Sequence, residues 1–156
     1  MKSGKLISAT ALLVALAIPV SLAAQEHPTK HHRYKLVDMG TLGGPASYAS
    51  GQEPGAQYIN NRGMFAGYAD TSTPDPFAPN CFNTDCFVSH TFRWQDGVLT
   101  DLGAIADSSG FTAMNDRGWI SGSSENGLLD PLTGLPENVA VLWKGDQLIY
   151  LGNVRE

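Results

Sequence analysis

The sequence carries little charge, and basic residues are the scarcer kind. Only 16% of its 156 residues are Asp, Glu, Lys or Arg, and 15 acidic residues outnumber 10 basic ones, which gives a formal net charge of −5. Proteins that bind nucleic acids or anionic lipids through electrostatics present basic surfaces to them. The composition therefore argues against nucleic acid and against an anionic membrane surface as partners.

The sequence also lacks the motifs that mark common catalytic sites. It has no Gly-x-Ser-x-Gly nucleophile elbow, and its glycine-rich stretch GTLGGPAS (40–47) lacks the Lys-Ser/Thr of a phosphate-binding loop. His90 is the one histidine after the N-terminal region, and hydrogen bonding within the fold is a simpler role for it than membership of a Ser-His-Asp triad. We therefore predict no catalytic residue, no metal site and no cofactor.

A long apolar run occurs only at the N-terminus. MKSGK, which carries two lysines, precedes an apolar stretch from Leu6 to Ala24 that ends in small residues. A charged start, an apolar middle and a small-residue end are typical of a secretory signal peptide, here residues 1–24. An uncleaved membrane anchor is the alternative, because the run approaches spanning length. We expect cleavage after Ala23 or Ala24, a periplasmic or extracellular location, and no further membrane contact.

Residues 25–35 form a short basic segment directly after this expected signal. It contains His27, His31 and His32 and ends in the run KHHRYK. A solvated N-terminal arm is the expected structure, because no apolar pattern would fold it. Metal binding by its histidines stays open.

Cysteine is almost absent, and the two that occur are close together. Cys81 and Cys86 lie in CFNTDC. In an oxidising compartment two neighbouring thiols usually pair, so we predict a disulfide. A metal site that also uses His90, or two free thiols, are the alternatives.

The chain repeats itself. INNRGMFAGYA (59–69) is echoed by MNDRGWISGSS (114–124), and a Leu/Met-Gly pair precedes each copy while a Trp before a Gly-containing turn follows it. The spacing between these landmarks varies, as it does when surface loops of different length interrupt a repeated unit. The landmark residues are Asn60, Asn61, Gly63 and Trp94 in the first copy and Asn115, Asp116, Gly118 and Trp143 in the second.

The local chemistry of each copy predicts β-hairpins. Asn, Asp and Gly favour tight turns, and short apolar runs flank both Asn-Asn/Asp-Arg-Gly sequences. We expect about four strands in each unit, the first at 36–100 and the second at 101–150, with a third beginning at 151–156. The predicted fold is all-β, with repeated four-stranded antiparallel units that resemble β-propeller blades in an incomplete ring. A β meander or sandwich is the alternative. Unpaired blade edges would favour self-association.

These repeats resemble a known family. DLGAIADSSGFTAMNDRGWISGSS (101–124) followed by AVLWKGDQLIYLG (140–152) is similar to the HAF repeat of extracellular bacterial proteins. HTF at 90–92 stands where the family has His-Ala-Phe, although the second copy has no histidine there, and DMGTLGG at 38–44 matches a further family segment. The resemblance implies an exported, propeller-like repeat protein. It implies no reaction and no catalytic residues.

An insertion at 71–89 distinguishes the first unit from the second. It contains Phe77, Phe82 and Phe87 around the two cysteines. Exposed loops often carry binding residues, so this loop is the expected ligand site. Packing of the loop on its own aromatic side chains is the alternative.

Taken together, these features favour an exported, non-enzymatic repeat protein. It would serve as a binding or structural module for an extracellular or envelope ligand, either a glycan or a protein. A truncated, propeller-type carbohydrate-active hydrolase or lyase is the alternative, and it would need a cluster of carboxylates. The candidates for that cluster are Asp96, Asp107, Asp116 and Asp130.

Overall fold

The computed structural model describes residues 33–49 and 56–152. The expected signal peptide, the histidines at 27, 31 and 32, and the last four residues lie outside this described part.

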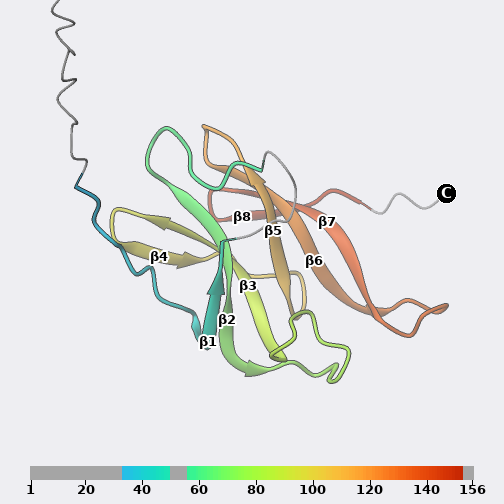
Figure 1. The fold of residues 1–156 in the computed structure, drawn as a ribbon. Helices are drawn as coiled ribbons and strands as arrows, with labels where there is room; N and C mark the ends of the chain where they lie inside the picture. The colour runs from blue at the N-terminus through green and yellow to red at the C-terminus, as the bar shows by residue number, and fades with distance from the viewer. Residues whose placement is uncertain (1–32, 50–55, 153–156) are drawn as a thin grey trace, which may run out of the picture. The chain divides into compact units, whose positions relative to one another are not determined.

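The described residues from Gly43 onwards form two four-stranded antiparallel sheets (Figure 1). In each sheet the spatial order of the strands follows their order in the chain, so each sheet is a meander. The first sheet contains β1 (Gly43–Tyr48), β2 (Phe65–Pro74), β3 (Phe87–Gln95) and β4 (Val98–Asp101). The second contains β5 (Ser109–Met114), β6 (Trp119–Leu129), β7 (Pro136–Lys144) and β8 (Gln147–Tyr150).

The predicted all-β fold with two four-stranded antiparallel units is confirmed. The described part of the chain forms no helix, and hence none with the length and hydropathy needed to cross a membrane. The two sheets do not join into a closed ring.

The Asn-Asn-Arg-Gly and Asn-Asp-Arg-Gly landmarks form matching turns. Asn60 Oδ1 accepts hydrogen bonds from the N–H groups of Arg62 (2.9 Å) and Met64 (3.1 Å). Asn115 Oδ1 accepts the equivalent bonds, from Arg117 (2.9 Å) and Trp119 (3.0 Å). Both turns end in a glycine with φ near +75°, a conformation that costs other residues energy: 73° at Gly63 and 80° at Gly118.

The two turns also contact each other. The Asn60 side-chain amide donates to the carbonyl of Asn115 (3.4 Å), and Asn61 N–H donates to Asp116 Oδ1 (3.4 Å). Four landmark residues of the repeat therefore join the two units at one end of the sheets. Sequence equivalence and spatial contact coincide here.

The main hydrophobic core lies between the two sheets. Met64 and Ala66 of the first unit pack with apolar side chains of the second, which are Phe111, Met114, Ile120, Val139, Val141 and Trp143. Trp143 is 1% exposed, and its indole N–H donates to the carbonyl of Leu102 (3.0 Å). The second sheet therefore supplies most of this core.

Trp94 occupies the equivalent position in the first sheet but is only half-buried. The guanidinium of its neighbour Arg93 donates a hydrogen bond to Asp146 of the second unit (3.3 Å). Successive side chains of a strand point to opposite faces of the sheet, so Trp94 lies on the face directed away from the second unit. Among the described residues no further sheet covers that face. Equivalent tryptophans thus differ in burial because only one has a partner sheet.

The segment that links the two sheets covers part of the edge of β3. β4 pairs with β3 only from Phe92 onwards. In the part of β3 that β4 does not reach, Ser89 N–H donates to Ser108 Oγ (3.3 Å) and Thr91 N–H donates to Ser109 Oγ (2.9 Å). Leu102 N–H donates to the carbonyl of Thr91 (2.9 Å). Two serine hydroxyls and one backbone amide therefore continue the ladder of β3 where the paired strand has ended.

Candidate functional site

The inserted loop between β2 and β3 is closed by the predicted disulfide. Cys81 and Cys86 are bonded, and the described residues contain no free cysteine. The alternative metal site with His90 is wrong, because both sulfurs are in the disulfide. No other group of three or more His, Cys, Asp or Glu side chains that could hold a metal ion occurs in the described ranges.

Asp75 organises this loop from inside. Its carboxylate is 4% exposed and accepts hydrogen bonds from the N–H groups of Phe77 (2.8 Å) and Phe82 (3.0 Å). Asp75 N–H in turn donates to the carbonyl of Cys86 (2.9 Å). The acid thus holds the backbone that carries two of the three predicted ligand-loop phenylalanines.

A polar network fastens the loop to the first sheet. Asn83 donates to Ser89 Oγ (2.6 Å), and that hydroxyl donates to Asp70 Oδ1 (2.8 Å). Asp85 accepts a hydrogen bond from the Tyr48 hydroxyl (2.8 Å). Two loop residues are therefore bonded to β1 and β3, and the fully buried Asp70 of β2 lies at the centre.

Asp70 and Asp85 are neighbouring carboxyl groups whose ionisation is coupled. Asp85 Oδ1 is buried and has no hydrogen-bond partner among the described residues. Burial and the neighbouring Asp85 raise the pKa of Asp70. Burial opposes ionisation of Asp85 too, but the hydrogen bonds from Tyr48 and Asp70 outweigh it and lower the pKa of Asp85. Of the two coupled groups, Asp70 is therefore the weaker acid.

Phe82 lies on the sheets, not in solvent. Its ring makes an edge-to-face contact with Tyr68 of β2 (centroids 6.4 Å apart). It also lies over Gly110 of β5, where an added Cβ would come within 2.9 Å of the ring. The loop of the first unit therefore reaches the second sheet through this ring, and Gly110 provides the space for it.

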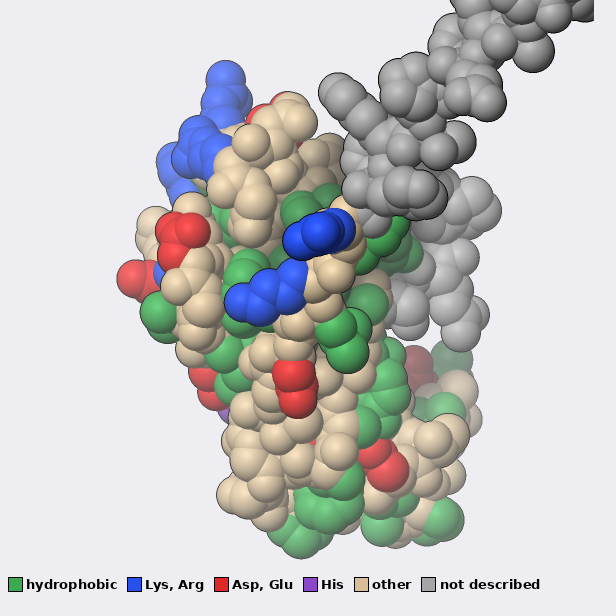
Figure 2. All heavy atoms as spheres, turned by 60° about the vertical axis from the view of Figure 1, so that its left-hand side comes forward, with side chains coloured by type: hydrophobic (Ala, Val, Ile, Leu, Met, Phe, Trp, Pro, Cys, Tyr) green, Lys and Arg blue, Asp and Glu red, His purple; other side chains and the backbone are tan. Residues whose placement is uncertain are grey.

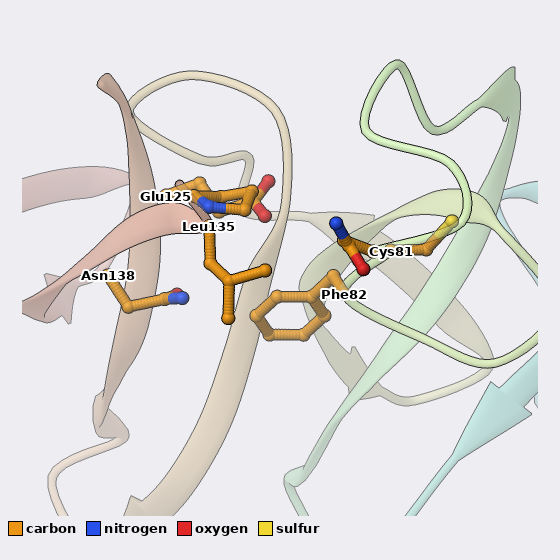
Figure 3. Close-up of a pocket in the computed structure, with 7 residues that line it drawn as sticks. Cys81, Phe82, Glu125, Leu135 and Asn138 are labelled. Atoms are coloured by element: carbon orange, nitrogen blue, oxygen red, sulfur yellow. The ribbon is translucent and has the colours of Figure 1, made fainter. Parts of the chain in front are cut away.

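A pocket of 420 Å³ opens between this loop and the second sheet. In Figure 3, Leu135 and Asn138 extend towards the Phe82 ring, while Cys81 points away from the cavity. The pocket thus combines one aromatic ring, two side-chain amides and a carboxylate. The lining residues are Asn80, Cys81, Phe82, Glu125, Leu135, Pro136 and Asn138.

Glu125 is the buried acid of the pocket. It is 1% exposed, and its Oε2 accepts a hydrogen bond from the N–H of Ser108 (2.9 Å). Burial raises the pKa of Glu125, and the charges of Asp75 and Asp107 raise it further. Asp70 is its counterpart in the first sheet and accepts the equivalent bond from Ala46 N–H (3.0 Å). The repeat therefore includes a buried acid on its second strand.

Of the three phenylalanines predicted to bind a ligand, the structure places one at the pocket. Phe82 lines it, whereas Phe77 lies earlier in the loop and Phe87 begins β3, opposite Pro74. Sequence reasoning did not identify Glu125, Asn80 or Asn138. When the two copies are aligned, Glu125 occupies the position of Asp70. An acidic residue at the same position of both copies was the signal in the sequence that could have identified Glu125.

Four exposed leucines lie at the end of β6 and in the turn that follows it, and one of them lines the pocket. Leu128 and Leu129 end β6, whereas Leu132 (93% exposed) and Leu135 (43% exposed) lie in the turn, and Leu135 is the pocket residue. In Figure 2 the Lys and Arg side chains lie in the upper half of the view, while hydrophobic side chains occur over the whole of this face. The four leucines are Leu128, Leu129, Leu132 and Leu135.

His90 connects strands and does not activate a serine. Its Nδ1 lies 3.0 Å from Asp101 Oδ2 on β4, and its Nε2 lies 3.2 Å from the carbonyl of Asp107. The nitrogen that would serve as the base of a triad therefore bonds the backbone. The Asp101 hydrogen bond raises the pKa of His90 despite its partial burial. Burial opposes ionisation of Asp101, yet the His90 hydrogen bond prevails and lowers the pKa of Asp101.

We predict that this pair makes a small, pH-dependent contribution to stability. A histidine with a raised folded-state pKa stabilises the fold fully below its unfolded pKa of about 6.5, and the contribution disappears as pH rises through the folded value. Replacing His90 by Gln should cost about 0.5–1 kcal/mol at pH 5.5, since the pair is partly exposed, and less at pH 8.5. Urea unfolding at both pH values measures the difference. In an Asp101→Asn background the pH dependence of the His90→Gln effect should disappear; its persistence would contradict the pairing.

The four carboxylates proposed for a hydrolase do not form one cluster. Asp116 lies in the turn before β6 and Asp130 in the turn after it. An 11-residue strand separates them by roughly 35 Å, whereas paired glycosidase acids lie about 5–10 Å apart. Asp96 occupies the β3–β4 turn with φ of 52°. Asp130 Oδ1 accepts hydrogen bonds from the N–H groups of Leu132 (2.7 Å) and Thr133 (3.1 Å). These bonds stabilise the turn that contains Asp130.

No protein-family model, no curated protein and no solved structure matches this chain.

Proposed function

We propose that the protein is an exported, non-enzymatic binding module whose pocket between the disulfide loop and β7 takes a carbohydrate. The observation that carries the proposal is the composition of this pocket, in which Phe82, Asn138 and Glu125 line one cavity of 420 Å³. Small-molecule sites usually occupy about 300–1,000 Å³ and combine apolar walls with a few polar groups.

The chemistry of the lining favours a sugar over a purely apolar ligand. A pyranose ring has apolar C–H faces and a rim of hydroxyl groups. Phe82 and Leu135 offer surfaces for the apolar faces, and the amides of Asn80 and Asn138 can both donate to and accept from hydroxyls. Glu125 adds an acceptor, which suits a neutral sugar better than an acidic one.

The proposed architecture follows the HAF-repeat resemblance. We propose that the two sheets are blade-like units of a β-propeller array, since each is a four-stranded meander and the turns at Asn60 and Asn115 contact each other. The Cys81–Cys86 disulfide supports export, because disulfides persist in oxidising compartments. The proposed location is periplasmic or extracellular.

The proposal is tested by glycan binding with variants of the pocket. The mature chain is screened against a panel of neutral and acidic glycans, and hits are measured by calorimetry. We expect Phe82→Ala to weaken binding about two- to tenfold, because stacking on an aromatic ring contributes about 0.5–1.5 kcal/mol. Phe77→Ala is the matched control, since Phe77 lies in the same loop but does not line the pocket.

Because Phe82 also contacts Tyr68 and Gly110, its loss can loosen the loop. Asn138→Ala is therefore the second variant: Asn138 is exposed and its truncation leaves the packing intact. It should lower affinity without changing the thermal midpoint. If no neutral glycan binds, or if Phe77→Ala and Phe82→Ala weaken binding equally, the pocket is not a carbohydrate site.

A further inference from the structure

The buried acid of the pocket has no opposite charge beside it. Glu125 is 1% exposed, and Ser108 is the hydrogen-bonding partner of its carboxyl group among the described residues. Both ion pairs in the described part of the chain involve other residues. Burying a carboxylate without a counter-ion costs free energy, and buried charges in proteins are usually paired. A cation bound in the pocket would supply the missing charge.

The surroundings of Glu125 are acidic as well. Burial is the main reason that the pKa of Glu125 is raised, and the charges of Asp75 and Asp107 raise it further. The described residues that line the pocket include no Lys, Arg or His. The electrostatic potential in the pocket is therefore negative, which favours a cationic group over a neutral one. Such a group would also favour the ionised form of Glu125.

The other lining groups suit an ammonium ion. An ammonium group has three N–H donors and no acceptor, so carboxylate and carbonyl oxygens bind it. The side-chain amides of Asn80 and Asn138 offer such oxygens, and an aromatic ring such as that of Phe82 attracts cations to its face. These groups line the same cavity as Glu125 (Figure 3).

We propose that the pocket binds the protonated amine of an amino sugar and that Glu125 selects it. The amine site is part of the proposed carbohydrate pocket, so it rests on that function and narrows it to glycans with free amines. The carboxylate pairs with the ammonium group, and the amides of Asn80 and Asn138 accept its remaining N–H groups. The hydroxyl of a neutral sugar also donates to Glu125 but leaves the charge of the acid unpaired. A neutral sugar is therefore the weaker ligand.

The test compares two trisaccharides on the mature chain by calorimetry. One is the glucosamine trisaccharide of fully deacetylated chitin. The other is cellotriose, which has the same linkages and a hydroxyl wherever the first has an amine. At about pH 6.5, where amines carry their proton, we expect the amino sugar to bind about tenfold more tightly. This preference is measured on the unaltered protein, and equal affinities would overturn the proposal.

Glu125→Gln tests which residue is responsible for the preference. Glutamine keeps an acceptor for the Ser108 N–H but removes the charge, so the preference for the amine should disappear while cellotriose still binds. Glu137→Gln is the matched control. It makes the same change of charge beside Asn138 in the chain, but Glu137 does not line the pocket, so the preference should remain. An unchanged thermal midpoint shows that each variant is folded.

The outcomes separate the amine site from the carbohydrate function. If both trisaccharides bind equally and Phe82→Ala weakens both, the carbohydrate function stands and the amine site does not. A preference that survives in Glu125→Gln, or that Glu137→Gln removes to the same extent, would come from the overall negative charge and would also overturn the amine site. Binding of neither trisaccharide overturns the amine site, and failure of the whole glycan panel overturns the carbohydrate function with it.

Discussion

A Trp143→Ala variant is expected to lose about 3–5 kcal/mol of unfolding free energy, the usual cost of emptying a buried tryptophan site. Trp143 is 1% exposed, packs among residues of both units and donates its indole N–H to the Leu102 carbonyl. Its removal leaves a cavity in the core between the sheets and an acceptor without its donor. Chemical denaturation followed by far-ultraviolet circular dichroism measures the change.

Trp94→Ala is the matched control, since it removes the same side chain from the equivalent position of the repeat. Trp94 is half-buried, so we expect a loss of only about 1–2 kcal/mol. Equal losses for the two variants would show that the faces of the two sheets are equally covered. That outcome would contradict the placement of the main core between the sheets.

An Asp70→Ala variant is expected to lose about 3 kcal/mol, because several buried polar groups lose their partner together. Asp70 accepts hydrogen bonds from the Ala46 N–H and the Ser89 hydroxyl, and its ionisation is coupled to that of Asp85. The disulfide loop should therefore loosen, which hydrogen exchange of its amides would reveal.

Asp70→Asn tests whether Asp70 carries a proton in the folded protein. An asparagine amide donates as the protonated carboxyl does, so we expect this variant to lose about 1 kcal/mol, far less than Asp70→Ala. Since the pKa of Asp70 is raised, its contribution is complete below the unfolded value near 3.9 and declines as pH rises through the folded value. That decline should be absent in Asp70→Asn. If Asp70→Asn were as unstable as Asp70→Ala, Asp70 would be ionised in the folded protein.

Local chemistry is what made the strands, the turns and the disulfide predictable. The turns at Asn60 and Asn115 depend on their own side chains and on a glycine three residues later, all within one short stretch of sequence. The disulfide depends on two cysteines of small separation and on an oxidising compartment. Such features need no knowledge of how distant segments pack.

The pocket was beyond prediction because it is assembled from distant segments. Phe82 comes from the insertion of the first unit, and Asn138 from β7 of the second. The buried acids were missed for another reason: Asp and Glu are usually exposed, so Asp70 and Glu125 were not expected inside. Each accepts a hydrogen bond from a backbone N–H of a neighbouring segment, Ala46 for Asp70 and Ser108 for Glu125, and the sequence does not display that contact.

The meander order of both sheets has a kinetic consequence. Each strand pairs with its neighbours in the chain, so every hairpin joins strands that are adjacent in sequence and can close before the sheets meet. All-β proteins usually fold slowly because their contacts join residues far apart in sequence, and this topology avoids much of that delay. The slow step would then be the docking of the two preformed sheets around Met64 and Trp143. Substitutions at that junction should retard refolding more than substitutions within a hairpin.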